Sequence, residues 1–426
     1  MRKFWLYVAV ALVATLPGLS VRLAGMHVSA VAGALIAGLG ILAAGFMLSW
    51  GLEAAEEHVS RGLALAVLAL ITVLPEFVVD FYYALQGERH PGSEYVQFAA
   101  ANMTGANRLL VGFGWPAIVL LYWWRSGKRS VELRWDNAVE ISFLALGSLY
   151  SFVIVLKQRI EWFDAVALFV LFAAYLRRLA WLPKEHENDA EDNDDEPEVG
   201  PGAALNQLPR PQQFTIIAAL AAVAGAIILF EAEPFAESLI GAASVLGVNK
   251  FLLIQWVSPL AGELPEIIIM ILFTLSLRPG YALGALISDK INQWTLLVGT
   301  LPVVYSFGAG TLSRLPLDAR QGEEFFLTAA QSLFAVALLL RLRFSLPSAL
   351  ILLVLFLTQL GIGFVFQHDE VRTIQFLTWF AWLYLLLAVI LAIANRALFI
   401  EYIRVGLLNQ PVTGVRRGVA GPESAS

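Results

Sequence analysis

The sequence predicts an all-α polytopic membrane protein, and composition and apolar run length carry this prediction. Hydrophobic residues make up 58% of the 426 residues and charged residues only 15%, whereas soluble globular domains average about 45–50% and about 25%. Apolar residues also gather into long runs, and a helix needs roughly 20 of them to cross a bilayer. The chain is therefore expected to have lipid as its main solvent and partner.

Apolar stretches of spanning length occur twelve times along the chain. They cover residues 4–22, 28–48, 60–86, 95–124, 138–156, 162–182, 213–232, 250–277, 281–307, 325–342, 347–366 and 372–395. The first stretch follows two basic residues, as a signal peptide does, but Pro17 and Arg22 interrupt it. Because no small-x-small cleavage site follows, we interpret it as a retained helix.

A polar segment divides the twelve stretches into six and six. Nine acidic residues and one Lys lie between Lys184 and Glu198, so this segment accounts for the whole negative balance of the chain, whose net charge is -6. Four prolines and little apolar content predict a disordered linker over residues 184–212.

The distribution of Lys and Arg predicts the orientation in the membrane. If the spans alternate, 18 basic residues lie on the side of the N-terminus and 8 on the opposite side. Basic loops stay in the cytoplasm, so both termini and the linker are predicted to be cytoplasmic, in a bacterial inner membrane or a plasma membrane. No basic field suited to nucleic acid is present, and the absence of Cys excludes a Cys nucleophile and thiolate metal sites.

The two halves of the chain resemble each other. Leu-Pro-Glu ends at Glu76 and again at Glu266, and Asn102 and Asp289 each precede by ten positions the Gly of a Leu-Leu-Val-Gly. Five predicted spans separate the equivalent points, and because five is odd, the second copy is expected to lie upside down in the bilayer. Inverted repeats are the architecture of secondary transporters, with the substrate site between the repeats.

The chemistry of the repeated residues predicts a cation site. Pro75 and Pro265 lack the N–H that a helix interior needs, so each helix is expected to break beside its glutamate. A carboxylate at the bilayer centre costs about 2.5–3.5 kcal/mol and marks an ion pathway by default. Carboxylates, an amide and free carbonyls are the oxygen ligands that Ca²⁺ prefers.

These motifs resemble those of the sodium/calcium exchanger family, within the wider cation/calcium exchanger superfamily. The family pattern is Gly-Thr-Ser-Leu-Pro-Glu, followed by a helix with Gly-Asn-x-x-Gly-Ser-Asn or an Asp variant. The resemblance implies two inverted five-helix repeats plus one extra helix per half. The expected divisions are an extra helix at 1–24, repeats at 25–183 and 213–370, the cytoplasmic linker at 184–212, and a further helix and tail at 371–426.

The resemblance also implies the ligands of the site. Glu76, Glu266, Asn102 and Asp289 match the positions that bind the cation, and Thr72 matches a threonine whose carbonyl faces the ions. The serine of the family pattern is replaced by Val73 and by Glu263. In another alignment, Gly262 and Glu263 begin a segment similar to the Gly-Asn-x-x-Glu motif of proton-coupled calcium exchangers, which leaves sodium and proton coupling both open.

Other charged residues near these motifs have alternative interpretations. Asp80 lies one helical turn after Glu76, and it either carries protons or caps the helix near the surface. Glu263 shares a helix face with Glu266, and it is either a second carboxylate of the site or the partner of a basic group. Lys290 is a built-in counterion or a snorkelling residue, and for Arg108 we expect snorkelling to the interface.

We therefore expect an antiporter that exchanges Ca²⁺ or a similar cation for Na⁺ or H⁺ by alternating access, with no resident cofactor and no enzymatic activity. The rival functions are a Na⁺(K⁺)/H⁺ antiporter on the same fold, a passive cation channel and an intramembrane enzyme. An enzyme would need a nucleophile–His pair or paired His ligands within the spans, and the sequence contains neither.

Overall fold

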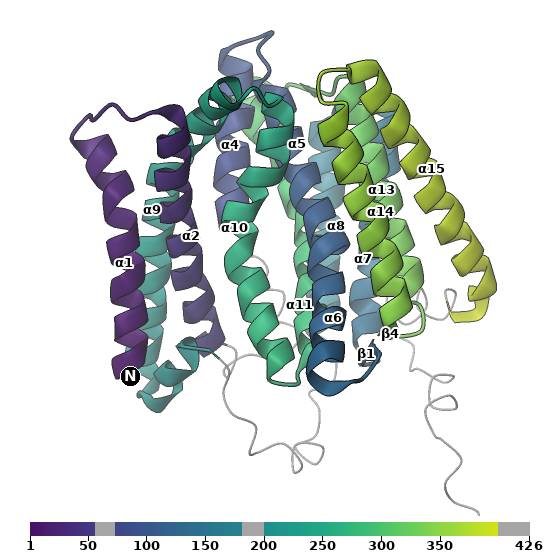
Figure 1. The fold of residues 1–426 in the computed structure, drawn as a ribbon, viewed down its shortest axis with the longest axis horizontal. Helices are drawn as coiled ribbons and strands as arrows, with labels where there is room; N and C mark the ends of the chain where they lie inside the picture. The colour runs from purple at the N-terminus through teal and green to yellow at the C-terminus, as the bar shows by residue number, and fades with distance from the viewer. Residues whose placement is uncertain (56–72, 181–199, 399–426) are drawn as a thin grey trace, which may run out of the picture.

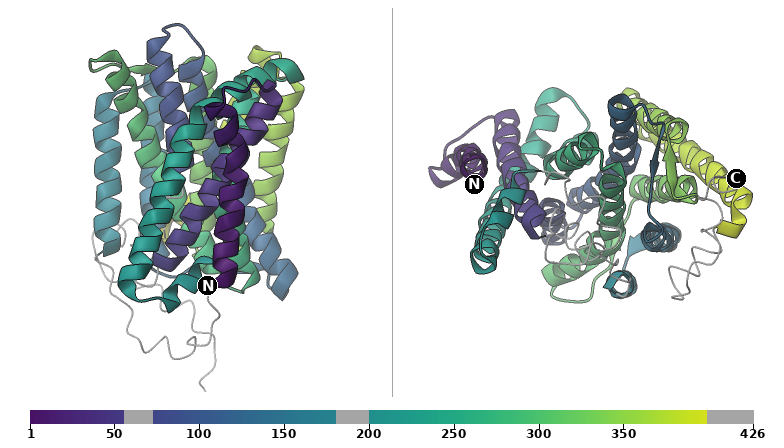
Figure 2. Two further views of the ribbon diagram at one scale, coloured as in Figure 1. Left: turned by 90° about the vertical axis from the view of Figure 1, so that its left-hand side faces the viewer. Right: turned by 90° about the horizontal axis from the view of Figure 1, so that it is seen from below.

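The computed structural model is a bundle of helices that stand side by side and run from the upper to the lower face of the molecule in Figure 1. It describes residues 1–55, 73–180 and 200–398. Seen from below, along the helices, α1 and α15 lie on opposite sides of the bundle (Figure 2). The α-helices are α1 (Arg2–Leu23), α2 (Ala30–Ala55), α4 (Leu74–Arg89), α5 (Tyr95–Leu109), α6 (Trp115–Ser126), α7 (Asn137–Lys157), α8 (Trp162–Ala180), α9 (Arg210–Leu246), α10 (Lys250–Leu275), α11 (Pro279–Asn292), α12 (Val298–Ala309), α13 (Ala319–Leu339), α14 (Leu346–Val365) and α15 (Glu370–Ala394).

Two of the long rods contain a short π-helical turn. η2 (Leu110–Gly114) joins α5 to α6, and η5 (Gln293–Leu297) joins α11 to α12. Each of the twelve predicted stretches therefore corresponds to one helical rod, although the first part of 60–86 lies outside the described residues. In the described part of the chain, nine helical segments are long and apolar enough to cross a membrane.

The prediction for α9 was too short. The helix extends from Arg210 to Leu246 as 37 residues, well beyond the predicted end at 232. The acidic residues beyond position 232 have partners on neighbouring helices: Arg22 pairs with Glu233 at 2.7 Å, and the hydroxyls of Tyr82 and Tyr95 donate to Glu237. Paired acids can stay on a helix, so the apolar pattern alone underestimated its length.

The linker prediction is corrected in its last part. Residues 184–199 lie outside the described residues, but η4 (Gly202–Gln207) is a 3₁₀ helix and α9 begins at Arg210. The backbone N–H of Gly202 donates to Glu53 of α2 at 2.7 Å. The segment is ordered because it buries Leu205 and gives this carboxylate a donor.

Two small ribbons display the inverted relation between the halves. β1 (Ser130–Glu132) pairs antiparallel with β4 (Arg343–Ser345), and β2 (Arg159–Ile160) pairs with β3 (Leu315–Pro316). In both ribbons a strand of the first half pairs with a strand of the second. The spanning helix α7 separates β1 from β2, so the two ribbons lie at opposite ends of the bundle, as an inverted repeat requires.

The repeats also pack through equivalent helices. α4 lies against α12, and α10 lies against α5. Most buried apolar side chains belong to this central body, whereas α1, α2 and α9 share a second apolar cluster that includes Phe4, Met47 and Ile228. The three helices stand side by side at the left of Figure 1.

The closest approach of α5 and α10 depends on a glycine. A Cβ added to Gly105 would overlap the backbone carbonyl of Gln255, and this backbone atom cannot move without moving α10. We expect Gly105→Ala to lower stability by about 1–3 kcal/mol, the usual cost of overpacking a core. The measurement is thermal denaturation of the purified protein in detergent.

Gly361→Ala is the matched control for this prediction. Gly361 also lies inside a helix, α14, but an added Cβ would meet nothing within 4 Å. The control is expected to be neutral or slightly stabilising, because Ala is the better helix former. Equal destabilisation by both substitutions would contradict the role given to Gly105.

Candidate functional site

The site is built where α4 and α10 cross in the middle of the bundle. α4 begins at Leu74, so Pro75 and Glu76 occupy its first turn, where a proline needs no N–H donor. The carboxylate of Glu76 lies directly against Gly262 of α10, and a Cβ on that residue would overlap it. Glycine at 262 is therefore what lets the first repeat place its glutamate against the second.

The second Leu-Pro-Glu does not break its helix. α10 continues from Lys250 to Leu275 with Pro259 and Pro265 inside it, so the predicted break at this position was wrong. The ring of Pro265 packs against Gly45 of α2, where a Cβ would come within 2.7 Å of it. Because α2 leaves room for the ring, the helix tolerates the proline. The one hydrogen bond that the proline removes is the one that the backbone carbonyl of Ala261 would have accepted.

Three carboxylates gather beside this crossing. Glu263, Glu266 and Asp289 can each place an oxygen within 4.8 Å of the others. All three are buried, and so is Glu76, whose two oxygens have no hydrogen-bond donor among the described residues. Buried charges are expected to be paired or to bind ions, so this arrangement has the oxygen-rich character of a site for a hard cation.

Gln293 links the carboxylates of two helices. Its Nε2 donates to Glu263 in a short contact and to Asp289 at 3.2 Å. The sequence interpretation missed this residue, although it lies one turn after Asp289 and opens η5. A π-helical turn in this position is informative, because such turns are frequent at functional sites.

Asn102 and Asp80 form a second polar pair on the first-repeat side. Asn102 Nδ2 donates to Asp80 Oδ1 at 2.8 Å, and both residues are buried. The alternative in which Asp80 caps the helix near the surface is therefore wrong. The amide oxygen of Asn102 has no donor among the described residues, and Thr72 lies outside them.

Lys290 lies at the same depth as the carboxylates. Its side chain is 1% exposed, and Nζ donates to the backbone carbonyl of Asn107 on α5 at 2.8 Å. The ammonium also lies 5.4 Å from the centre of the Trp294 ring. Its burial excludes snorkelling to the interface.

The snorkelling prediction for Arg108 was also wrong. Arg108 is 1% exposed, forms a short ion pair with Glu324 of α13, and stacks over the Trp256 ring at 5.0 Å. Glu324 also lies 4.0 Å from Arg320. Arg108 therefore joins α5 to α13 through Glu324 and to α10 through Trp256.

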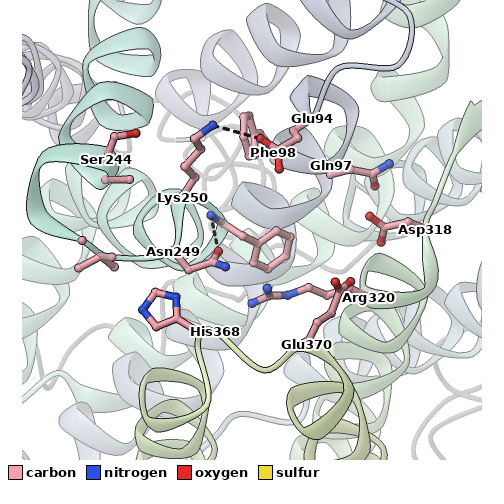
Figure 3. A pocket seen from close by; sticks show the side chains of 14 residues that line it. Glu94, Gln97, Phe98, Ser244, Asn249, Lys250, Asp318, Arg320, His368 and Glu370 are labelled. Carbon is pink, nitrogen blue, oxygen red and sulfur yellow. Dashed lines mark hydrogen bonds and ion pairs between the residues drawn. The ribbon is translucent and has the colours of Figure 1, made fainter.

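An external pocket lies on the far side of the bundle from the N-terminus. It encloses about 470 Å³ and is lined by charged residues of four helices and the loops that precede them, among them Glu94, Lys250, Asp318, Arg320 and Glu370 (Figure 3). Lys250 pairs there with Glu94 at 3.3 Å. Phe98 also lines the pocket, and Asn102 follows it one turn deeper along α5.

Comparisons with known proteins agree with this geometry. The sodium/calcium exchanger protein family profile matches residues 29–181 and 216–365. The crystal structure of an H⁺/Ca²⁺ exchanger, CAX, is 38% identical, with 96% of this chain and 99% of that chain covered and a TM-score of 0.86. The sodium–calcium exchanger NCX_Mj, soaked with Na⁺ and Sr²⁺, is 18% identical, with 78% and 97% covered and a TM-score of 0.53, and shows the shared fold. No curated protein sequence matches significantly. The matches in both halves, together with the paired glutamates at the crossing, place this chain in the sodium/calcium exchanger family.

Proposed function

We propose that the protein exchanges Ca²⁺ for H⁺ across the membrane, with Glu76, Glu266, Asn102 and Asp289 holding the cation and Glu263 completing the site. The observation that carries the proposal is the buried cluster of Glu263, Glu266 and Asp289, whose oxygens come within 4.8 Å. Ca²⁺ takes oxygen ligands in number, and carboxylates so close together cannot remain charged without a bound cation.

Proton coupling is supported by the residues that surround the carboxylates. The chain has Val73 and Glu263 where the family pattern has a serine, so two hydroxyl ligands are replaced by an apolar group and a carboxylate. A carboxylate can release a proton when Ca²⁺ binds and take one up when Ca²⁺ leaves. The relative that is 38% identical is described as an H⁺/Ca²⁺ exchanger, which favours the same coupling here.

The two apolar clusters suggest which parts move. α1, α2 and α9 share one cluster, and the central body holds the other, which α2 and α9 also join through residues such as Ile41 and Phe235. In the proposal the three helices slide as a unit against the body, so that the site opens to one side at a time. The external pocket is the proposed outer mouth of the site. The protein is proposed to lie in a bacterial inner membrane or a plasma membrane, with both termini in the cytoplasm.

The test is calcium flux in proteoliposomes at a clamped membrane potential. A pH gradient is expected to drive Ca²⁺ uptake against its own gradient, because each Ca²⁺ bound displaces protons from the same carboxylates. A sodium gradient of the same size, without a pH gradient, is expected to drive none. Equal uptake with sodium would reject proton coupling, and uptake that follows only the Ca²⁺ gradient would indicate a channel.

A further inference from the structure

The ammonium group of Lys290 belongs to the transport site by its position. Residue 290 directly follows Asp289 in α11, and its side chain is buried, as are those of Asp289 and Glu263. In the described part of the chain, Nζ forms no ion pair within 4.0 Å and has the Asn107 carbonyl as its hydrogen-bond acceptor. The amine is therefore held at a buried position by a neutral carbonyl, and no single carboxylate of the described residues pairs with it.

The repeat shows that this charge is an addition to one half only. Asn102 and Asp289 are equivalent, so Met103 of the first repeat is equivalent to Lys290 of the second. Where the first repeat has an amide and a thioether, the second has a carboxylate and an ammonium. The second repeat therefore carries one extra negative and one extra positive charge, side by side and both buried.

A count of charges shows what the ammonium does for the site. Glu76, Glu263, Glu266 and Asp289 supply up to four negative charges, and Ca²⁺ supplies two positive ones. A remaining imbalance is costly in a buried place and draws in further cations. An ammonium on the chain removes one unit of that imbalance and, unlike an exchangeable cation, cannot leave with the cargo.

We propose that Lys290 is a tethered cation of the transport site, which takes the place of one exchangeable monovalent cation. The proposal rests on the Ca²⁺ exchange proposed above. It implies that the ammonium disfavours binding of Na⁺ or K⁺ next to Ca²⁺, so that Lys290 determines the specificity for a divalent ion. It also implies that Ca²⁺ binds more weakly than the carboxylates alone would allow, because like charges repel.

The test measures equilibrium binding of radioactive Ca²⁺ to the purified full-length protein in detergent, with Na⁺, K⁺ or choline at matched ionic strength. Lys290→Gln removes the charge and keeps a donor for the Asn107 carbonyl, and Lys290→Arg keeps the charge. We expect Lys290→Gln to bind Ca²⁺ about tenfold more tightly or more. We also expect Na⁺ and K⁺ to compete with Ca²⁺ in this variant beyond the effect of choline.

The controls separate charge from structure. Lys290→Arg is expected to behave as the wild type, and so is Lys128→Gln, which removes an exposed lysine far from the site. Unchanged or weaker Ca²⁺ binding by a folded Lys290→Gln protein would overturn the proposal, and so would an Arg variant that behaves like the Gln variant. If neither variant folds, the wild type still decides, because competition by Na⁺ or K⁺ beyond choline contradicts a site already filled by its own ammonium.

Failure of the proposed exchange has a different result. If the wild-type protein binds no Ca²⁺ and shows no uptake driven by a pH gradient, the proposed function itself is contradicted. If the wild type binds and transports Ca²⁺ but the Lys290→Gln variant has the same affinity and the same cation preference, only the role proposed for Lys290 is contradicted.

Discussion

Proteoliposomes that contain Glu266→Gln or Glu76→Gln are expected to lose Ca²⁺ uptake by more than about 100-fold. Substitution of groups that only support a ligand already costs about 10–100-fold in affinity, and these two residues are proposed as ligands themselves. The amide keeps the shape of the side chain but removes the charge that attracts Ca²⁺ and the proton that is exchanged for it. Both side chains are buried, and the carboxylate of Glu76 lies directly against α10 at Gly262.

The measurement combines uptake driven by a pH gradient with equilibrium Ca²⁺ binding in detergent. Glu323→Gln is the matched control: this half-buried glutamate of α13 accepts a hydrogen bond from Thr378, which an amide oxygen can also accept. The control is expected to keep uptake and binding within about twofold of the wild type, because surface-like substitutions are close to neutral. Wild-type uptake in the Glu76→Gln, Glu266→Gln double variant would refute the site.

Arg108→Met is expected to destabilise the protein by about 3–5 kcal/mol, the usual cost of removing one partner of a buried ion pair. Arg108 and Glu324 are both buried and form a short ion pair between α5 and α13. Without the guanidinium, the basic partner left to Glu324 among the described residues is Arg320, at 4.0 Å. The cation–π contact of Arg108 with Trp256 is lost as well.

The double variant Arg108→Met, Glu324→Met tests the cause of this loss. Replacement of a buried ion pair by apolar groups of similar volume is often neutral, so the double variant is expected to recover most of the stability. Thermal denaturation in detergent of the wild type, the two single variants and the double variant measures the coupling between the two residues. If the double variant is as unstable as the sum of the single variants, the two side chains act independently.

The repeat is the reason that part of the site could be predicted. Leu-Pro-Glu occurs twice in register with Asn102 and Asp289, so the sequence indicated that Glu76 and Glu266 should come together. Gln293 and Glu324 have no counterpart in a repeated motif, and nothing local distinguishes them from other polar residues of apolar helices. Their contacts with Glu263 and Arg108 join residues 30 and more than 200 positions apart.

The two incorrect expectations about local structure have the same origin. Pro265 was expected to break its helix, but Gly45 of another helix gives its ring room and the helix continues. The stretch predicted for α9 ended at 232, before Glu233 and Glu237, but Arg22, Tyr82 and Tyr95 from other helices pair with these acids and the helix continues. In both cases a residue distant in the sequence lowered the free-energy cost of placing a proline, or a charged residue, inside a helix.

The sequence by itself determined that the chain spans a membrane and that its halves are inverted copies, and it predicted a cation site at Glu76 and Glu266. These properties follow from run length, from the odd number of spans between equivalent motifs and from the cost of charge in lipid, none of which needs coordinates. Only the tertiary structure decided that Arg108 pairs with Glu324, that Asp80 binds Asn102, and that the amine of Lys290 donates to a carbonyl of α5. The physical reason is that a buried charge takes its role from its nearest partners, and in this fold those partners come from other helices.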